Sequence, residues 1–211
     1  CQNIWICCGD DAECDDGDDV CTSDSCVNQF CAFNPTGEPG CCESNPVQLD
    51  FESLVALEIT NSSNPCTRQV ATTDQNQTLG GTKVLYYGDV GSNNYNCGLN
   101  SGTVITETFS LLDGVAYNLS FKLMMDTETS TSYDKLFIYA MAAGQEIELW
   151  NKSKLTASKG VWKTYEANFN GFAGQDVQLK FFFNTGDSGL NATKGVFVDD
   201  ISITSTCLPH P

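Results

Sequence analysis

The segment YNLSFKLMMDTETSTSYDKLFIYA, residues 117–140, decides the fold class of this chain. In its first part, Tyr117, Leu119, Phe121, Leu123 and Met125 alternate with residues that are mostly polar. This period of two is typical of a half-buried β-strand. Residues 133–142 contain a second strand candidate, so the segment predicts β-structure rather than helix.

The same pattern recurs along the chain. Alternation marks residues 177–183, and Phe197, Ile201 and Ile203 are expected to share one face of the last strand. Further strand candidates, separated by glycine-containing turns, are 47–52, 68–72, 82–88, 103–110, 145–151 and 161–169. About ten short strands without a convincing helical stretch predict an all-β fold, an antiparallel β-sandwich or jelly roll with minimal helix.

Residues 1–46 have a different composition from the β-domain predicted over 47–211. Nine of the twelve cysteines lie in the first 42 residues, among many aspartates. This head contains too few large apolar residues to fold on a core alone, so covalent or metal bonds must stabilise it. We expect disulfides rather than zinc, because the head has no CxxC spacing and no histidine.

An odd number of bridges must join the head to the β-domain if every thiol is paired within the chain. The simplest arrangement pairs Cys66 with Cys97, and Cys207 with the head near Cys42. Cys42 lies just before the first predicted strand and Cys207 lies just after the last one. The two cysteines would therefore meet if these terminal strands are neighbours in the sandwich. The full connectivity stays open.

Charge and hydropathy restrict the classes of partner. The chain carries 27 acidic and 10 basic residues, a net charge of −17, and only one arginine. Nucleic-acid binding is therefore not expected, since it depends on Lys and Arg. The chain begins at Cys1 and has no run of about 18 apolar residues. We expect a mature extracellular protein, secreted or at a cell surface, without a membrane span.

Several motifs occur in a recognisable order within residues 47–207. They are LDFE, VLYYGDVGSNNYNCGLNSGTVITETFSL, YNLSFKLMMDTETSTSYDKLFIYA, GVWKTYEANFNGFAGQDVQLKFFFNTGDS and GVFVDDISIT. This order resembles the MAM-like jelly-roll modules of secreted and cell-surface proteins. The head, CDDGDDVCTSDSCVNQFCAFNPTGEPGCC, is similar to the DDGxxCTxDxC cysteine-rich repeats of large bacterial surface proteins. The tryptophan usual after the first strand of such jelly rolls is not obvious here.

The MAM-like resemblance implies a structural calcium ion between the first and last strands. The matching positions are Asp50 or Glu52, and Asp199 or Asp200. A buried carboxylate at Asp199 is costly unless it is paired or binds a metal. Residues in glycine-rich loops that could complete the oxygen shell are Asp89, Asp187 and Asn191. The alternative is that these carboxylates accept backbone hydrogen bonds or lie solvated in turns.

The acidic loop of the head is a second calcium candidate. Its hard oxygen ligands are Asp11, Glu13, Asp15, Asp16, Asp18 and Asp24. The aspartates and glycine are not in the order of an EF-hand. The alternative is a solvated acidic loop.

No catalytic constellation is recognisable in the sequence. The only histidine is His210, and the chain has no E-x-D-x-E strand of the kind found in sandwich glycosidases. We therefore expect a non-enzymatic, calcium-stabilised module for adhesion or assembly, with a cell-surface or matrix protein or copies of itself as partner. Filament-like self-assembly would use the apolar Ile4, Trp5 and Ile6. The alternative is a carbohydrate-binding module that uses aromatics such as Tyr95 and Trp150.

The cysteine pattern predicts that the native protein has no free thiol and that one bridge joins Cys207 to the head. Closing Cys66 to Cys97 stabilises the fold by about 3–4 kcal/mol on the chain-entropy model. Non-reducing peptide mapping measures both features. Two or more thiols alkylated without reductant, or an unbridged Cys207, would contradict this arrangement.

Overall fold

The computed structural model describes residues 8, 10–14, 22–35, 47–52, 57–61, 68–72, 81–112 and 115–207. In these ranges the chain is almost entirely β-structure, with short 3-10 turns at η1 (Asp11–Cys14), η2 (Lys152–Lys154) and η3 (Asn170–Phe172) and no α-helix. No helix in this part of the chain is long and apolar enough to cross a membrane. All strand pairs are antiparallel. The predicted antiparallel sandwich is confirmed.

The head contains a hairpin of β1 (Thr22–Val27) and β2 (Phe30–Pro35). Its two-residue turn, Asn28 and Gln29, has φ angles of 54° and 71°, the left-handed values that a tight hairpin turn of the primed type requires. Cys26 and Cys31 lie opposite each other in the hairpin. Each forms a disulfide to the preceding segment, Cys8–Cys26 and Cys14–Cys31. The expected disulfide framework is therefore present in the described part of the head.

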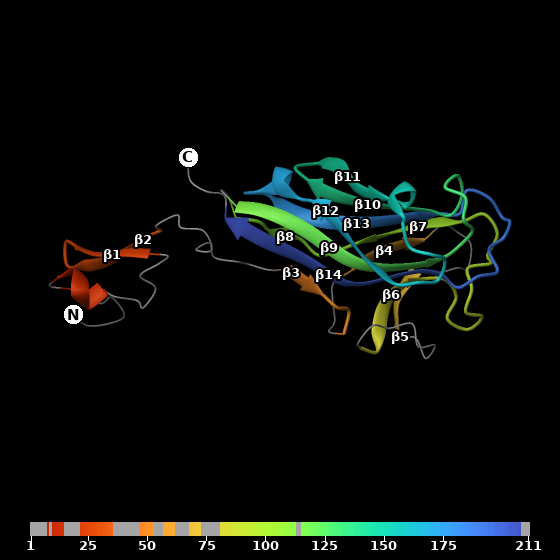
Figure 1. The fold of residues 1–211 in the computed structure, drawn as a ribbon, viewed down its shortest axis with the longest axis horizontal. Helices are drawn as coiled ribbons and strands as arrows, with labels where there is room; N and C mark the ends of the chain where they lie inside the picture. The colour runs from red at the N-terminus through yellow and green to blue at the C-terminus, as the bar shows by residue number, and fades with distance from the viewer. Residues whose placement is uncertain are drawn as a thin grey trace.

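The β-domain consists of two sheets packed face to face (Figure 1). Sheet I has the order β11 (Gln145–Asn151), β10 (Lys135–Ala142), β13 (Asp176–Asn184), β7 (Ser101–Ile105) and β4 (Glu58–Asn61), with β8 (Phe109–Ser110) beside β13. Sheet II has the order β12 (Lys163–Asn168), β9 (Val115–Asp126), β14 (Gly195–Cys207), β6 (Lys83–Tyr87) and β5 (Arg68–Thr72), with β3 (Val47–Leu49) beside β14.

The strands follow the sequence pattern closely, with two exceptions. Residues 145–151 form β11 as expected, whereas the candidate strand 103–110 is divided between β7 and β8. Strand β4 and the head hairpin were not expected from the sequence. Strands β1 and β4 are short and largely polar, so they lack the apolar alternation that identifies a strand.

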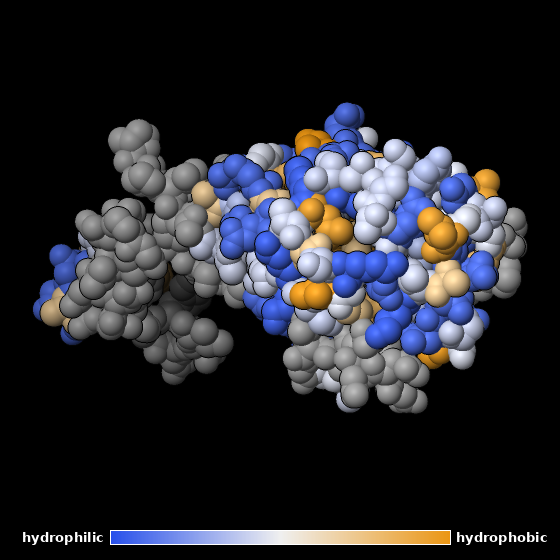
Figure 2. All heavy atoms as spheres, turned by 45° about the vertical axis from the view of Figure 1, so that its right-hand side comes forward, coloured by the Kyte–Doolittle hydropathy of each residue, from blue (hydrophilic) through white to orange (hydrophobic). Residues whose placement is uncertain are grey.

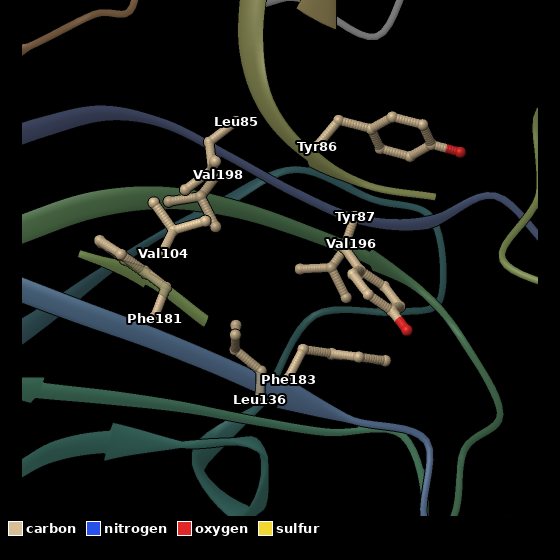
Figure 3. A pocket seen from close by; sticks show the side chains of 9 residues that line it. All are labelled: Leu85, Tyr86, Tyr87, Val104, Leu136, Phe181, Phe183, Val196 and Val198. Atoms are coloured by element: carbon tan, nitrogen blue, oxygen red, sulfur yellow. The ribbon is translucent and has the colours of Figure 1, made fainter. Parts of the chain in front are cut away.

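The core lies between the two sheets and is closely packed. In Figure 3, Leu136 and Phe183 of sheet I point toward Tyr87 and Val196 of sheet II, whereas Tyr86 points away. The gap between these side chains is about 20 Å³ and is lined by hydrophobic and aromatic residues. A space of this size holds no more than a single water molecule. It is an imperfection of core packing and not a ligand site.

A β-bulge in β14 corrects one prediction about the last strand. Asp199 pairs with Lys122 but Ser202 pairs with Ser120, so β14 has one extra residue at this point. Ile201 and Ile203 therefore face the main core. Phe197 instead packs on the outer side of sheet II, in a second cluster with Val84, Tyr86 and Met124, against which Trp162 also packs. The expectation that Phe197 shares a face with Ile201 was wrong.

The first and last strands of the β-domain are neighbours, as expected. Val47 of β3 pairs with Ile203 of β14, and β14 ends at Cys207. Cys97 is disulfide-bonded. Its expected partner Cys66, and Cys42, lie outside the described residues, so these pairings stay predictions.

The replacement Leu136→Ala is expected to destabilise the fold by about 2–5 kcal/mol, because it enlarges a gap that the surrounding sheets cannot close. Leu136 is 3% exposed. The midpoint of urea unfolding measures the loss. The matched control is Ile147→Ala on the edge strand β11, whose side chain is 50% exposed; its effect should stay within about 0.5 kcal/mol. Equal effects of the two variants would contradict this description of the core.

Candidate functional site

The outer face of sheet I carries an aromatic strip made of Phe137, Tyr139 and Phe182. Residues in β10 and β13 alternate between buried and half-buried. The buried residues point into the core, so the half-buried ones lie on the face turned away from sheet II. All three residues of the aromatic strip belong to this half-buried set.

The strand register brings the three rings together. Phe137 lies directly opposite Phe182, and Tyr139 is two residues farther along β10 on the same face. The ring centroids of Phe137 and Phe182 are 6.2 Å apart at an interplanar angle of 24°. Those of Phe137 and Tyr139 are 6.0 Å apart at 18°. The result is a row of nearly parallel rings fixed on rigid strands.

Charged groups border the aromatic strip on one side. Lys180 lies opposite Tyr139, and its Nζ is 5.6 Å from the centre of the tyrosine ring. The same Nζ forms a 2.7 Å ion pair with Glu146 of β11. Burial, together with the negative charges of Glu148 and Glu146, raises the pKa of Tyr139, so its phenol is a neutral hydrogen-bond donor at ordinary pH.

A depression of about 480 Å³ continues the aromatic strip toward the β10–β11 hairpin. Met141, two residues beyond Tyr139, lines it together with Gln178 and Glu146. Asp176, Thr108 and the turn residues 142–145 complete the lining. The outer face of sheet I thus combines flat apolar surfaces with hydrogen-bonding groups at their margin, as ligand sites do.

The two aromatics that the sequence suggested as ligand contacts are instead part of the core. Tyr95 is 0% exposed and Trp150 is 1% exposed. Tyr95 donates a 2.6 Å hydrogen bond to Asp134, and Trp150 packs edge-on against Phe121 and Tyr165. Neither side chain can stack against a ligand at the surface.

Sequence reasoning missed the aromatic strip because its strands carry apolar residues on both faces. Residues 136–139 and 181–183 are continuous apolar runs. Such runs normally indicate a strand that is buried on both sides. The signal that could have identified the site is the absence of any further predicted element to cover the second face.

Glu52 accepts hydrogen bonds from the start of β6. Its Oε1 accepts from the backbone N–H of Thr82 (2.7 Å) and Lys83 (2.8 Å), and its Oε2 accepts from the Thr82 hydroxyl (3.0 Å). A Cβ atom on Gly81 would lie 1.9 Å from Oε1 of Glu52, so glycine at position 81 allows the carboxylate to come this close to the backbone. These bonds, led by that from Lys83, lower the pKa of Glu52.

Asp199 and Asp200 lie at the bulge of β14. Asp199 is 3% exposed, and its Oδ1 accepts a hydrogen bond from the N–H of Asp200. Asp200 forms a 2.7 Å ion pair with Lys122. Leu49 pairs with Ile201, so Asp50 follows beside the bulge and Glu52 lies two residues farther along the chain. Hydrogen bonds and an ion pair engage these acids. Calcium at this position stays a prediction.

The remaining predicted metal ligands take part mainly in local hydrogen bonds. Asp50 accepts from the N–H of Glu52, Asp89 from Gly91 and Asp187 from Gly189, each within two residues in the chain. Asn191 is buried, with a contact to Gly98. Over the described residues, no three carboxylates bring oxygen atoms within 4.8 Å of one another.

In the head, Asp11 accepts a 2.7 Å hydrogen bond from the N–H of Cys26 and so supports the hairpin. Glu13 is exposed and Asp24 is half-buried in β1. Calcium binding by these acids stays a prediction. The remaining predicted residues of the head lie outside the described part of the chain: Ile4, Trp5, Ile6, Asp15, Asp16 and Asp18.

Comparisons with known proteins identify the fold. No protein-family model and no curated protein matches the chain. Among solved structures, the K1 cleaved adhesin domain of Lys-gingipain from Porphyromonas gingivalis W83 is similar, with 12% identity and a TM-score of 0.50, over 75% of this chain and 97% of that one. The K3 domain of the same protein gives 15% identity and 0.49, over 75% and 98%. The module TmCBM61 in complex with β-1,4-galactotriose gives 12% and 0.46, over 72% and 90%.

The bonds of Glu52 predict a pH-dependent contribution to stability. Because its pKa in the folded state lies below the ordinary 4.5, the contribution is present above about pH 4.5 and is lost as the pH falls through the folded-state value. Glu52→Gln is therefore less stable than the wild type at pH 7, and the difference shrinks toward pH 3. Urea midpoints across this range measure it.

The matched control is Glu166→Gln on the edge strand β12, where the carboxylate is exposed. Its effect should be small at every pH. A difference between Glu52→Gln and wild type that does not vary with pH would contradict the role given to the carboxylate charge.

Proposed function

We propose that this protein is a non-enzymatic extracellular adhesion module that binds glycans on the outer face of sheet I. The observation that supports this most is the aromatic strip, in which three nearly parallel rings lie half-buried on two adjacent strands. The order of motifs that resembles MAM-like modules of surface proteins favours the same class. Disulfides in the head are typical of an oxidising, extracellular compartment.

The chemistry of the outer face suits a sugar chain better than a protein or a lipid. A pyranose ring has an apolar C–H face, which packs on an aromatic side chain, and a rim of hydroxyl groups. Lys180, Glu146 and Gln178 supply donors and acceptors beside the rings. Because the rings sit on strands and not on loops, little ordering entropy is lost on binding.

Charge limits the class of glycan. The margin of the outer face contains Glu146, Glu148 and Asp176, and Lys180 is already paired with Glu146. The whole chain has a net charge of −17. An acidic sugar would therefore meet like charge, so the preferred ligand is a neutral or amino-containing oligosaccharide.

The side chains of this face support binding in preference to turnover. Hydrolysis of a glycosidic bond needs an acid and a second carboxylate across the scissile bond. Glu146 is tied to Lys180, and the only histidine of the chain, His210, is outside the described residues. The proposal of a durable surface module includes two further predictions. One is calcium binding at the bulge, and the other is homopolymer formation through Ile4, Trp5 and Ile6.

We expect Tyr139→Ala and Phe182→Ala each to weaken glycan binding at least about tenfold, because each removes one of the three aromatic contacts. A printed array of neutral and amino-containing oligosaccharides identifies the ligand, and calorimetry measures its Kd. The control is Tyr133→Ala, a tyrosine that is 40% exposed in the loop before β10 and is not part of the aromatic strip.

The control should bind like the wild type. A wild-type protein that retains none of the arrayed sugars would contradict the proposal, and so would a Tyr133→Ala variant as impaired as Tyr139→Ala.

A further inference from the structure

Three buried side chains at one end of the sandwich each have an oxygen atom without a hydrogen-bond donor among the described residues. The atoms are Asp134 Oδ1, Asn191 Oδ1 and Asn100 Oδ1. The residues are only 1%, 2% and 3% exposed, respectively. Buried polar atoms are almost always satisfied, so three such oxygens in one region need an explanation.

The backbone connects these three residues closely. The Thr185 N–H donates to Asn100 O at 3.0 Å, and the Asp134 N–H donates to Thr185 O at 2.8 Å. The Asn100 and Asn191 side chains both donate their Nδ2 to Gly98 O, at 2.7 and 3.4 Å. Because a carbonyl can only accept, these bonds also fix which end of each amide is the oxygen.

The charge around Asp134 is predominantly negative. Its Oδ2 accepts from the Tyr95 hydroxyl at 2.6 Å and the Glu128 N–H at 3.1 Å. Burial raises the pKa of Asp134, and the nearby Asp187 carboxylate raises it further. The pKa of Glu128 is raised as well, by burial first and then by Asp134 and Asp187.

One buried cation offsets part of this charge. Lys152, 4% exposed, donates to Glu128 O (2.8 Å) and Tyr133 O (2.9 Å), and its charge lowers the pKa of Asp134. Lys159 lies 3.6 Å from Asp126, and its charge also lowers the pKa of Glu128. Lys152 thus acts on both Asp134 and Glu128, whereas Asp187 adds negative charge beside these two carboxylates.

We propose that loops 127–134 and 185–191 together bind a divalent cation of the calcium class, with Asp134 as the central ligand and the Asn100, Asn191 and Asp187 oxygens as its companions. The site is independent of glycan binding. It is also distinct from the predicted calcium site at the β14 bulge, where Glu52 and Asp199 lie.

The donor set selects the type of metal. All candidate ligands are carboxylate or amide oxygens, which suit calcium, and neither histidine nor a free thiol is among them. Calcium accepts six to eight oxygens in irregular geometry, whereas magnesium requires a regular octahedron. Asp187 and Glu128 are half-buried, which gives an ion access from solvent. Figure 2 turns this end of the sandwich forward and shows mostly hydrophilic residues with scattered hydrophobic ones.

Terbium luminescence tests the proposal directly, since Tb³⁺ replaces calcium in oxygen sites and a nearby tyrosine sensitises its emission. The Tyr95 hydroxyl lies 2.6 Å from Asp134 Oδ2, so excitation of tyrosine in the full chain, freed of metal with chelator, should give emission that calcium displaces. Asp134→Asn and Asp187→Asn should each weaken terbium and calcium binding at least tenfold. Asp187→Asn is the more secure variant, because its carboxylate is partly exposed and its loss leaves the core intact.

Two matched controls separate this site from others. Asp89→Asn removes an exposed turn aspartate that accepts only a local hydrogen bond from Gly91, and Asp199→Asn removes the buried acid of the bulge. Both should retain the tyrosine-sensitised signal. Absence of the signal in the wild type, or its loss in Asp199→Asn but not in Asp187→Asn, would overturn the proposal. The three oxygens would then be satisfied by buried water.

Discussion

The antiparallel pairing of β9 with β14 is the interaction on which the rest of the sandwich depends. The two strands pair from Gly195 and Asp126 at one end to Cys207 and Val115 at the other. On its second side, β14 pairs with β6 over residues 196–198 and with β3 over 201–203. The bulge at Asp199 and Asp200 lies between these two stretches, so one inserted residue lets a single strand hold two different neighbours.

The proposed function needs a sheet with two apolar faces, and the β9–β14 layer makes this possible. Sheet II covers the inner face of sheet I and buries Leu136, Ile138 and Phe183. The strands of sheet I are then stable enough to present Phe137 and Phe182 on the outer face. Half-buried aromatics at a surface lower the solubility of a protein unless they have a partner. The proposed glycan would be such a partner.

The alternation of apolar and polar residues was sufficient to predict most strands, because a half-buried strand imposes this pattern locally. It could not predict the bulge, since one extra residue at Asp199 reverses the faces of all later positions relative to Phe197. The alternation also could not show that Trp150 faces the core and Phe137 faces outward. Which side of sheet I is buried depends on where the second sheet lies. The buried role of Asp134 was also missed, as its partners Tyr95 and Thr185 are distant in sequence.

We propose that the outer face of sheet I binds a glycan. Two-dimensional ¹H–¹⁵N NMR of the labelled protein, titrated with soluble cello-, laminari-, galacto- and chito-oligosaccharides, tests it most directly. We predict saturable shifts for at least one of these sugars, concentrated in Phe137, Tyr139, Phe182 and Lys180. Shifts confined to the loop ends or to edge strands, or no shifts with any of the four, would contradict it.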